Sequence, residues 1–242
     1  ALGAAGAVTA HYFRLGINLI SVVFEKPQTF FQTFFLYNFT LGLAVSLILW
    51  LKKLSKASEW HGPADTIYSV HRIDNEINVK LGIFSTIAAF ISASGGASVG
   101  QYGPLVHLGA TIGSWVKTKV SLNFSTDVFI GAGIAAAISA GFGAPFAGII
   151  FAHEAILRHF AFKALAPIAI ASTVSFGITQ AVWPSLPFFE QTVLNETISL
   201  MILVSCLVGP VFGLIAVVFM KSLLFFASLP RVLNLRQIHS AA

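Results

Sequence analysis

The residues of this chain that are suited to binding a small ion lie around two glycine-proline steps, Gly62-Pro63 and Gly103-Pro104. Proline favours the first turn of a helix, because its φ is already helical and the N–H group that it lacks would have no acceptor there. Each step therefore predicts the start of a helix. The free N–H groups at such a start carry about half a positive charge, which favours an anion without adding a counter-charge that would trap it.

Long apolar runs surround both steps and indicate a membrane. Hydrophobic residues make up 56% of the 242 residues and charged residues only 10%, against about 25% charged residues in an average soluble domain. Asp, Glu, Lys and Arg are absent from residues 30–51, 81–116, 128–153, 164–189 and 197–220. Each run exceeds the roughly 20 residues that a helix needs to cross hydrocarbon. The composition excludes a disordered, collagenous or disulfide-stapled protein and predicts an all-α, polytopic membrane protein.

The first apolar segments predict helices over residues 2–24 and 30–51, joined by a turn at Glu25-Lys26-Pro27. Three lysines follow the second helix: Lys52, Lys53 and Lys56. By the positive-inside rule this end should be cytoplasmic. We expect that the chain starts inside a transmembrane helix, and hence that further residues precede it. Most basic residues lie at segment ends, so the net charge of +5 indicates membrane orientation rather than nucleic-acid binding.

Two later segments predict helices that break inside the membrane. Residues 58–80 are too polar to face lipid, so we expect a broken or re-entrant segment with a short helix near Pro63. The charge-free run 81–116 is too long for one span, and a glycine-rich stretch from Ser94 to Pro104 interrupts it. Such backbone is tolerated at membrane depth only where protein buries it or water fills a cavity. A helix should begin at Pro104, so two helix N-termini would lie at membrane depth, as in transporters built from broken helices.

Small residues dominate the next segment and predict a tightly packed interior. Thirteen of the eighteen residues from Gly131 to Gly148 are Gly, Ala or Ser, which lets helix backbones approach closely in lipid. A break at Gly141–Pro145 precedes a helix from about Phe146, which carries His153 and Glu154 near its end.

The C-terminal part of the sequence predicts two more helices, over residues 164–183 and 197–229. Two prolines and two glutamates between them indicate an exposed loop: Pro184, Pro187, Glu190 and Glu196. Pro230 should end the last helix. The one cysteine, Cys206, lies in an apolar run, which favours a packed side chain over redox chemistry.

Three ordered motifs resemble those of the chloride channel and transporter (CLC) family. Residues Gly100–Gly109 are similar to the family's Gly-Arg/Lys-Glu-Gly-Pro motif and the helix after it, and Phe142–Glu154 to its Asn-Ala-Pro-x-Ala-Gly-x-x-Phe-x-x-Glu stretch. Trp60–Asp65 stand where the family has Gly-Ser-Gly-Ile-Pro-Glu, and they keep one glycine and an acid. The resemblance implies an anion site lined by these residues: His61, Gly62, Pro63, Gly100, Gln101, Tyr102, Gly103 and Pro104.

The resemblance also implies how the chain is organised. The CLC fold has two inverted-topology repeats, so residues 1–242 would form a single transmembrane domain, with the first repeat over about residues 1–196 and the first helix of the second repeat over 197–242. The family's second-half elements have no counterpart in these residues. The family is dimeric through helices equivalent to Phe146–His159 and Ala164–Trp183, which implies a homodimer in a lipid bilayer. Chloride or a similar small anion would be the transported ion.

Two departures from the family pattern predict conduction that is not coupled to protons. CLC transporters have a gating glutamate where this chain has Tyr102, whose phenol has a reference pKa of about 10 and keeps its proton at ordinary pH. The family's second, inward-facing proton glutamate aligns with Ala155, while Glu154 matches a structural glutamate. Tyr102 would then be a hydroxyl ligand or a neutral gate at the outer mouth of a channel-like pathway.

Other interpretations of these residues stay open. Tyr102 could be a packed aromatic residue, His61 could cap a neighbouring helix, and His107 is better explained as a helix-packing hydrogen bonder than as a ligand. His153 and Glu154 could form a rerouted proton path, which would make the protein a chloride/proton antiporter, or they could belong to an interfacial salt-bridge network. The chain could also be a non-conducting assembly subunit.

No sequence pattern points to catalysis. The spacing of the seven histidines gives no metal site, and there is no Ser-His-Asp elbow, Cys-x-x-Cys motif or phosphate-binding loop. We therefore expect neither an enzyme nor a bound cofactor or metal. The lack of cysteine chemistry is consistent with a bacterial inner membrane as the location.

Overall fold

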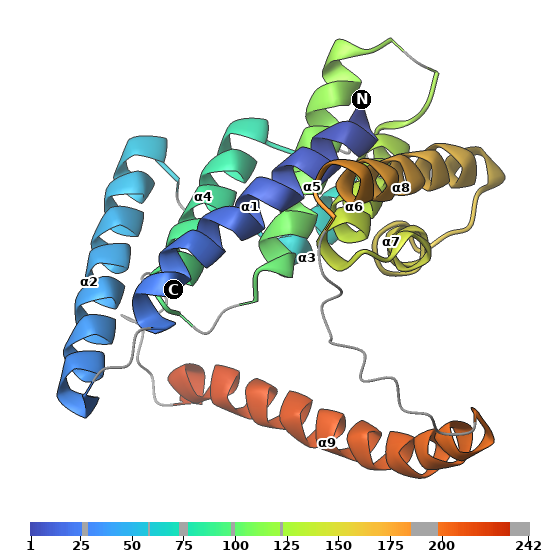
Figure 1. Ribbon diagram of the computed structural model, residues 1–242. Helices are drawn as coiled ribbons and strands as arrows, with labels where there is room; N and C mark the ends of the chain where they lie inside the picture. Colours follow the sequence, from blue (N-terminus) through green and yellow to red (C-terminus); the bar gives the residue numbers. More distant parts are fainter. Residues whose placement is uncertain are drawn as a thin grey trace. The chain divides into compact units, whose positions relative to one another are not determined.

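The computed structural model describes residues 1–25, 29–57, 59–72, 77–97, 100–121, 123–184 and 198–232. Every regular element in these ranges is helical (Figure 1), which confirms the all-α prediction. The chain divides into two compact units, Ala1–Phe188 and Phe189–Ala242. Three helices of the described ranges contain segments long and apolar enough to cross a membrane: Phe30–Ser55, Phe162–Val182 and Ile202–Phe225.

The two N-terminal helices are α1 (Leu2–Glu25) and α2 (Phe30–Ser55). Both start where the sequence predicts, but α2 continues four residues beyond the predicted end and stops at Lys56, whose φ of 55° is left-handed. The predicted turn between them falls on Lys26 and Pro27, which lie outside the described residues. Large apolar side chains are exposed along most of α2, as expected for a helix that faces lipid.

The broken segments form α3 (Pro63–Val70), α4 (Val79–Ser94) and α5 (Tyr102–Lys119). Pro63 is the first residue of α3, as predicted. The predicted start of α5 at Pro104 is wrong by two residues, because Tyr102 and Gly103 are already helical. Proline is tolerated there as well, since no N–H of the first turn has an acceptor within the helix.

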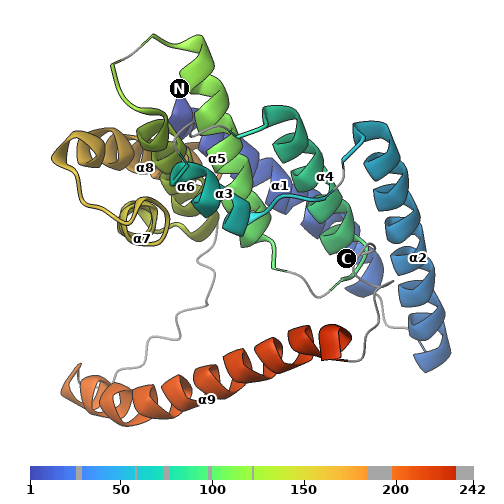
Figure 2. The same ribbon diagram turned by 180° about the vertical axis from the view of Figure 1, so that it is seen from behind.

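The centre of the first unit is α6 (Thr126–Phe142), which is buried along most of its length. It packs against α1, α5 and α8, as Figure 2 shows from behind. A Cβ added to Gly109 of α5 would lie 2.5 Å from the carbonyl oxygen of Gly133 on α6. The two helices therefore touch through their backbones, which is the packing that the small residues predict.

A left-handed glycine separates α6 from α7 (Pro145–Phe151). Gly143 has a φ of 65°, a conformation that costs glycine little, and Pro145 then begins α7. The helix continues as a π-helical segment, η1 (Ala152–Leu157), which ends at Arg158 with a φ of 56°. The predicted break is confirmed, and the π-helical turn that carries His153 and Glu154 is not evident from the sequence.

The remaining helices are α8 (Phe162–Val182) and α9 (Ile198–Val232). Pro230 does not end α9, which continues to Val232. Three residues of the predicted loop, Pro187, Glu190 and Glu196, lie outside the described residues. The assignment of residues 1–196 to a first repeat and of 197–242 to the start of a second stays a prediction.

Candidate anion site

The structure brings the two glycine-proline steps together. A Cβ added to Gly103, the second residue of α5, would lie 3.5 Å from the ring of Pro63, the first residue of α3. A Cβ added to Gly62 or Gly100 would meet no atom of the described residues within 4 Å, so this part of the chain leaves space beside the backbone in front of both helices. Two helix N-termini therefore converge, and each contributes N–H groups and a partial positive charge.

The two residues before α3 are each fixed by a hydrogen bond of their backbone N–H group. The backbone N–H of His61 donates to Ser85 Oγ of α4 at 2.9 Å, and that of Gly62 donates to Asp65 Oδ2 at 2.7 Å. The chain's own carboxylate thus occupies one donor at the N-terminus of α3. An anion at this end would interact with the remaining donors and with the negative charge of Asp65.

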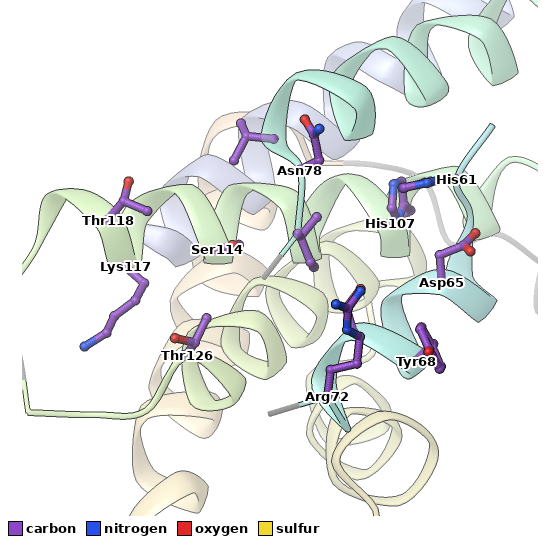
Figure 3. A pocket seen from close by; sticks show the side chains of 13 residues that line it. His61, Asp65, Tyr68, Arg72, Asn78, His107, Ser114, Lys117, Thr118 and Thr126 are labelled. Atoms are coloured by element: carbon purple, nitrogen blue, oxygen red, sulfur yellow. The ribbon is translucent and has the colours of Figure 1, made fainter. Parts of the chain in front are cut away.

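A cavity of about 800 Å³ lies between α3, the start of α4, α5 and the start of α6. Figure 3 shows His61, His107 and Asp65 together at one end and Lys117 at the other. Arg72 also lines the cavity. The lining therefore carries two basic side chains and one acidic side chain, which favours an anion over a cation.

His107 links α5 to α3 inside this cavity. Its side chain is only 2% exposed, and its Nδ1 lies 2.8 Å from Thr66 Oγ1. The ring of His61 packs edge-on against it, with ring centroids 6.4 Å apart. The interpretation of His107 as a hydrogen bonder between helices agrees with this contact. His61 contacts α4 through its backbone N–H, which donates to Ser85, whereas its ring lines the cavity.

Tyr102 lies at the start of α5 with its ring against other aromatic and aliphatic residues. The ring stacks on Phe142 at the end of α6, with centroids 3.8 Å apart and an interplanar angle of 22°. It also packs against the cluster that contains Phe13 and Leu105. This environment fits the packed-aromatic interpretation of the ring, while the gating role of the hydroxyl stays a prediction. Gln101 precedes α5 and Pro104 lies in its first turn.

Arg14 is a charged residue near Tyr102 that the sequence analysis does not single out. It comes from α1, and its Nη1 lies 3.5 Å from the carbonyl oxygen of Gly141 near the end of α6. Its guanidinium is close enough to Tyr102 for the charge to act on the phenol. It lines a second cavity of about 440 Å³ with His11, whose ring stacks on Trp183 at 4.1 Å. Charged groups among apolar helices are commonly functional.

His153 and Glu154 lie in different environments on η1. His153 is fully buried, its Nδ1 lies 3.0 Å from the carbonyl oxygen of His159, and its ring stacks on Phe160. Glu154 is exposed. His159 Nε2 lies 3.6 Å from Asp127 Oδ2, a contact that involves the side chain of neither His153 nor Glu154. The proton path and the salt-bridge network both stay predictions.

A family model described as voltage gated chloride channel matches residues 41–241 of the chain. The chain therefore belongs to the voltage-gated chloride channel (CLC) family. Proteins named voltage-gated ClC-type chloride channel ClcB are 24% identical over 131 residues in Yersinia pseudotuberculosis, 23% over 138 in Salmonella typhi and 24% over 143 in Escherichia coli. These alignments cover 54%, 57% and 58% of the chain, and 32%, 33% and 34% of the relatives. The chain thus spans about a third of the length of these relatives.

Membership of the CLC family confirms the resemblance carried by the three motifs. The sequence also identifies the start of α3 and, to within two residues, that of α5. It does not reveal the contact between Thr66 and His107, which are 41 residues apart. In the described part of the chain, no group of three or more His, Cys, Asp or Glu residues is arranged to hold a metal ion.

Proposed function

We propose that this chain forms part of a selective pathway for chloride or a similar small anion across a lipid bilayer. The convergence of the α3 and α5 N-termini carries this proposal, because Pro63 and Gly103 are in near contact and the backbone before each helix is open. Helix N-termini bind anions through N–H groups and the helix dipole. Within apolar helices the low dielectric strengthens this attraction.

Conduction through this pathway is not coupled to protons. A proton exchanger needs groups that bind and release protons along its path, and at the two positions where CLC transporters have glutamates this chain has Tyr102 and Ala155. The side chain of Ala155 is a methyl group that packs against the main hydrophobic cluster. The phenol of Tyr102 is neutral at ordinary pH. The pathway is therefore channel-like.

The functional protein is a homodimer in a bacterial inner membrane. The segments expected at the dimer interface, Phe146–His159 and Ala164–Trp183, leave large apolar side chains exposed, among them Phe146 at 79% and Ile170 at 61%. Apolar surface of this kind suits either lipid or a second subunit. The similar ClcB proteins come from bacteria, which supports the location.

A chloride/proton antiporter is the alternative that one observation favours. His153 is fully buried, and its Nε2 has no hydrogen-bond partner among the described residues. A buried imidazole of this kind can pass a proton, with the exposed Glu154 as its contact with water. A non-conducting assembly subunit is the second alternative, and a measurement of anion flux distinguishes it from the other two.

Anion flux from liposomes tests the three possibilities together. The full-length protein is reconstituted, a chloride gradient and a pH gradient are imposed separately, and the reversal potential is recorded. A potential set by the chloride gradient alone supports the uncoupled pathway. A shift with the proton gradient supports the antiporter, and the His153→Gln variant should then abolish that shift. Absence of flux from correctly folded protein supports the assembly subunit.

A further inference from the structure

The cavity between α3 and α5 contains a buried polar atom without a partner, Nε2 of His107. The atom makes no hydrogen bond in the described part of the structure, although the side chain is only 2% exposed. Buried polar atoms are hydrogen-bonded in the large majority of cases, because an unmet bond is costly in a low dielectric. This nitrogen therefore indicates a ligand.

The hydrogen bonds of Thr66 decide whether that nitrogen is a donor. The Thr66 hydroxyl has one proton and two acceptors within reach: the carbonyl oxygen of Gly62 at 3.3 Å and Nδ1 of His107 at 2.8 Å. A hydroxyl usually lies 2.5–3.0 Å from its oxygen acceptor, so 3.3 Å is long. Donation to Nδ1 is the better geometry. A neutral imidazole that accepts at Nδ1 carries its proton on Nε2.

The surroundings of this N–H suit an anion. The His107 ring lines the cavity beside the His61 ring, close to the N-terminus of α3. Arg72 and Lys117 also line the cavity, although Lys117 lies at the end away from His107. The carboxylate of Asp65, at the same end as His107, already accepts from Gly62 N–H.

Access to the nitrogen is controlled by His61. The ring of His61 lies next to that of His107, while only its backbone is fixed, through Ser85. In the described part of the chain no hydrogen bond of the His61 ring is found, so no such bond opposes a rotation of this ring.

We propose that Nε2–H of His107, held in this tautomer by Thr66, donates to a small monovalent anion in the cavity, with His61 as a movable cover. This inference rests on the proposed anion pathway. It adds the imidazole of His107 as a ligand of the anion, a group that lies outside both glycine-proline steps. Thr66 is a positioning residue, because it acts only through His107. The site uses neutral donors, so the anion is attracted without a counter-charge strong enough to hold it.

Nitrogen-15 NMR of the full-length protein, labelled at histidine, tests the tautomer and the ligand directly. The signal of His107 is assigned by its loss in His107→Gln. We expect the Nε2–H tautomer, and a shift of that nitrogen and its proton when sodium gluconate is replaced by sodium chloride at equal ionic strength. An Nδ1–H tautomer, or a signal that chloride leaves unchanged because water is the only ligand, would overturn the proposal.

Two matched pairs of variants test the role in binding. His107→Leu removes the donor, whereas His107→Gln keeps an N–H in a similar position; Thr66→Val removes the hydroxyl, whereas Thr66→Ser keeps it. Chloride affinity, measured by calorimetric titration of folded protein in detergent, should fall roughly tenfold or more in the first member of each pair, as expected for one hydrogen bond to a charged group. The second member should stay within about threefold of wild type. Equal affinities within the pairs contradict the site.

The outcomes separate this inference from the proposed function. Normal chloride flux with unchanged affinity in His107→Leu would refute the His107 site and leave the pathway intact. A chloride-dependent shift at His107 in a protein that conducts no anion would refute the pathway and leave the site. If His107→Leu does not fold, the Thr66 pair and the NMR measurement still decide, since both keep the histidine.

Discussion

Replacing Tyr102 with glutamate tests the gate position most directly. Tyr102 is the first residue of α5, so the new carboxylate would lie at a helix N-terminus, where a partly buried negative charge is stabilised by up to about 2 kcal/mol. The change also removes the ring that stacks on Phe142, a contact worth about 0.5–1.5 kcal/mol. The two effects are similar in size and opposite in sign, so the variant should fold about as stably as wild type.

The flux of Tyr102→Glu should depend on pH, because only the ionised carboxylate competes with an anion for the N-terminus of α5. If the N-terminus of α5 binds this carboxylate with about 1.4 kcal/mol, the occupancy of the anion there falls roughly tenfold. Glutamate has a reference pKa of about 4.3. The helix N-terminus stabilises the ionised form and so lowers this pKa, by about one unit for each 1.4 kcal/mol. Flux should therefore fall as pH rises from about 3 to about 5 and stay low at about pH 7, whereas the neutral phenol of the wild type gives no such fall.

Chloride efflux from liposomes, recorded across this pH range, measures the effect. Tyr102→Gln is the matched control, because its side chain has the shape of glutamate without the charge. Identical pH profiles for the two variants would show that position 102 does not face the anion, and Tyr102 would then be a packed aromatic residue. Tyr102→Phe reports separately on the hydroxyl, since it keeps the ring that contacts Phe142.

Three further predictions follow from single contacts. Gly109→Ala places a Cβ 2.5 Å from the carbonyl oxygen of Gly133 and should destabilise the protein by about 1–3 kcal/mol; thermal unfolding in detergent checks this, and Gly177→Ala, where a Cβ would meet nothing within 4 Å, should cost far less. Arg14→Gln removes a cation near Tyr102 and should lower chloride flux several-fold, while Arg14→Lys keeps most of it; equal losses would show that shape, not charge, matters. Asp65→Asn removes the negative charge at the α3 N-terminus but keeps an acceptor for Gly62 N–H, so chloride affinity in a calorimetric titration should rise; an unchanged affinity would place the anion away from α3.

The helix boundaries next to glycine and proline are predictable from the sequence because the constraints are local. Pro63 and Pro145 begin their helices and Gly143 takes a left-handed φ, each for a reason contained in one or two residues. The start of α5 is less predictable, since a proline is tolerated at several positions of the first turn. The predicted end of α9 is also wrong, because the helix continues through Pro230 to Val232.

The contacts that build the site are not predictable in this way. Thr66 and His107 are 41 residues apart, and Arg14 and Gly141 are 127 residues apart. No local pattern fixes such pairs, because they depend on how α1, α3, α5 and α6 pack. The small residues of α6 predict that helices approach closely, but they do not say which side chains then meet. Family motifs give the positions of the helix starts and nothing about Arg14.

The charges at the N-terminus of α5 differ from those of the family motif, and this difference makes pH dependence informative. At the start of α5 the motif's basic residue and glutamate are replaced by Gln101 and Tyr102, while a cation comes from Arg14 on α1. A carboxylic acid with a reference pKa of about 4 is ionised, and a phenol with a reference pKa of about 10 is neutral, throughout the range from about pH 5 to pH 8. Histidine is the side chain that changes charge within this range. A wild-type flux that changes between these pH values would therefore implicate a histidine, and a flat profile would mean that no histidine on the pathway changes charge within this range.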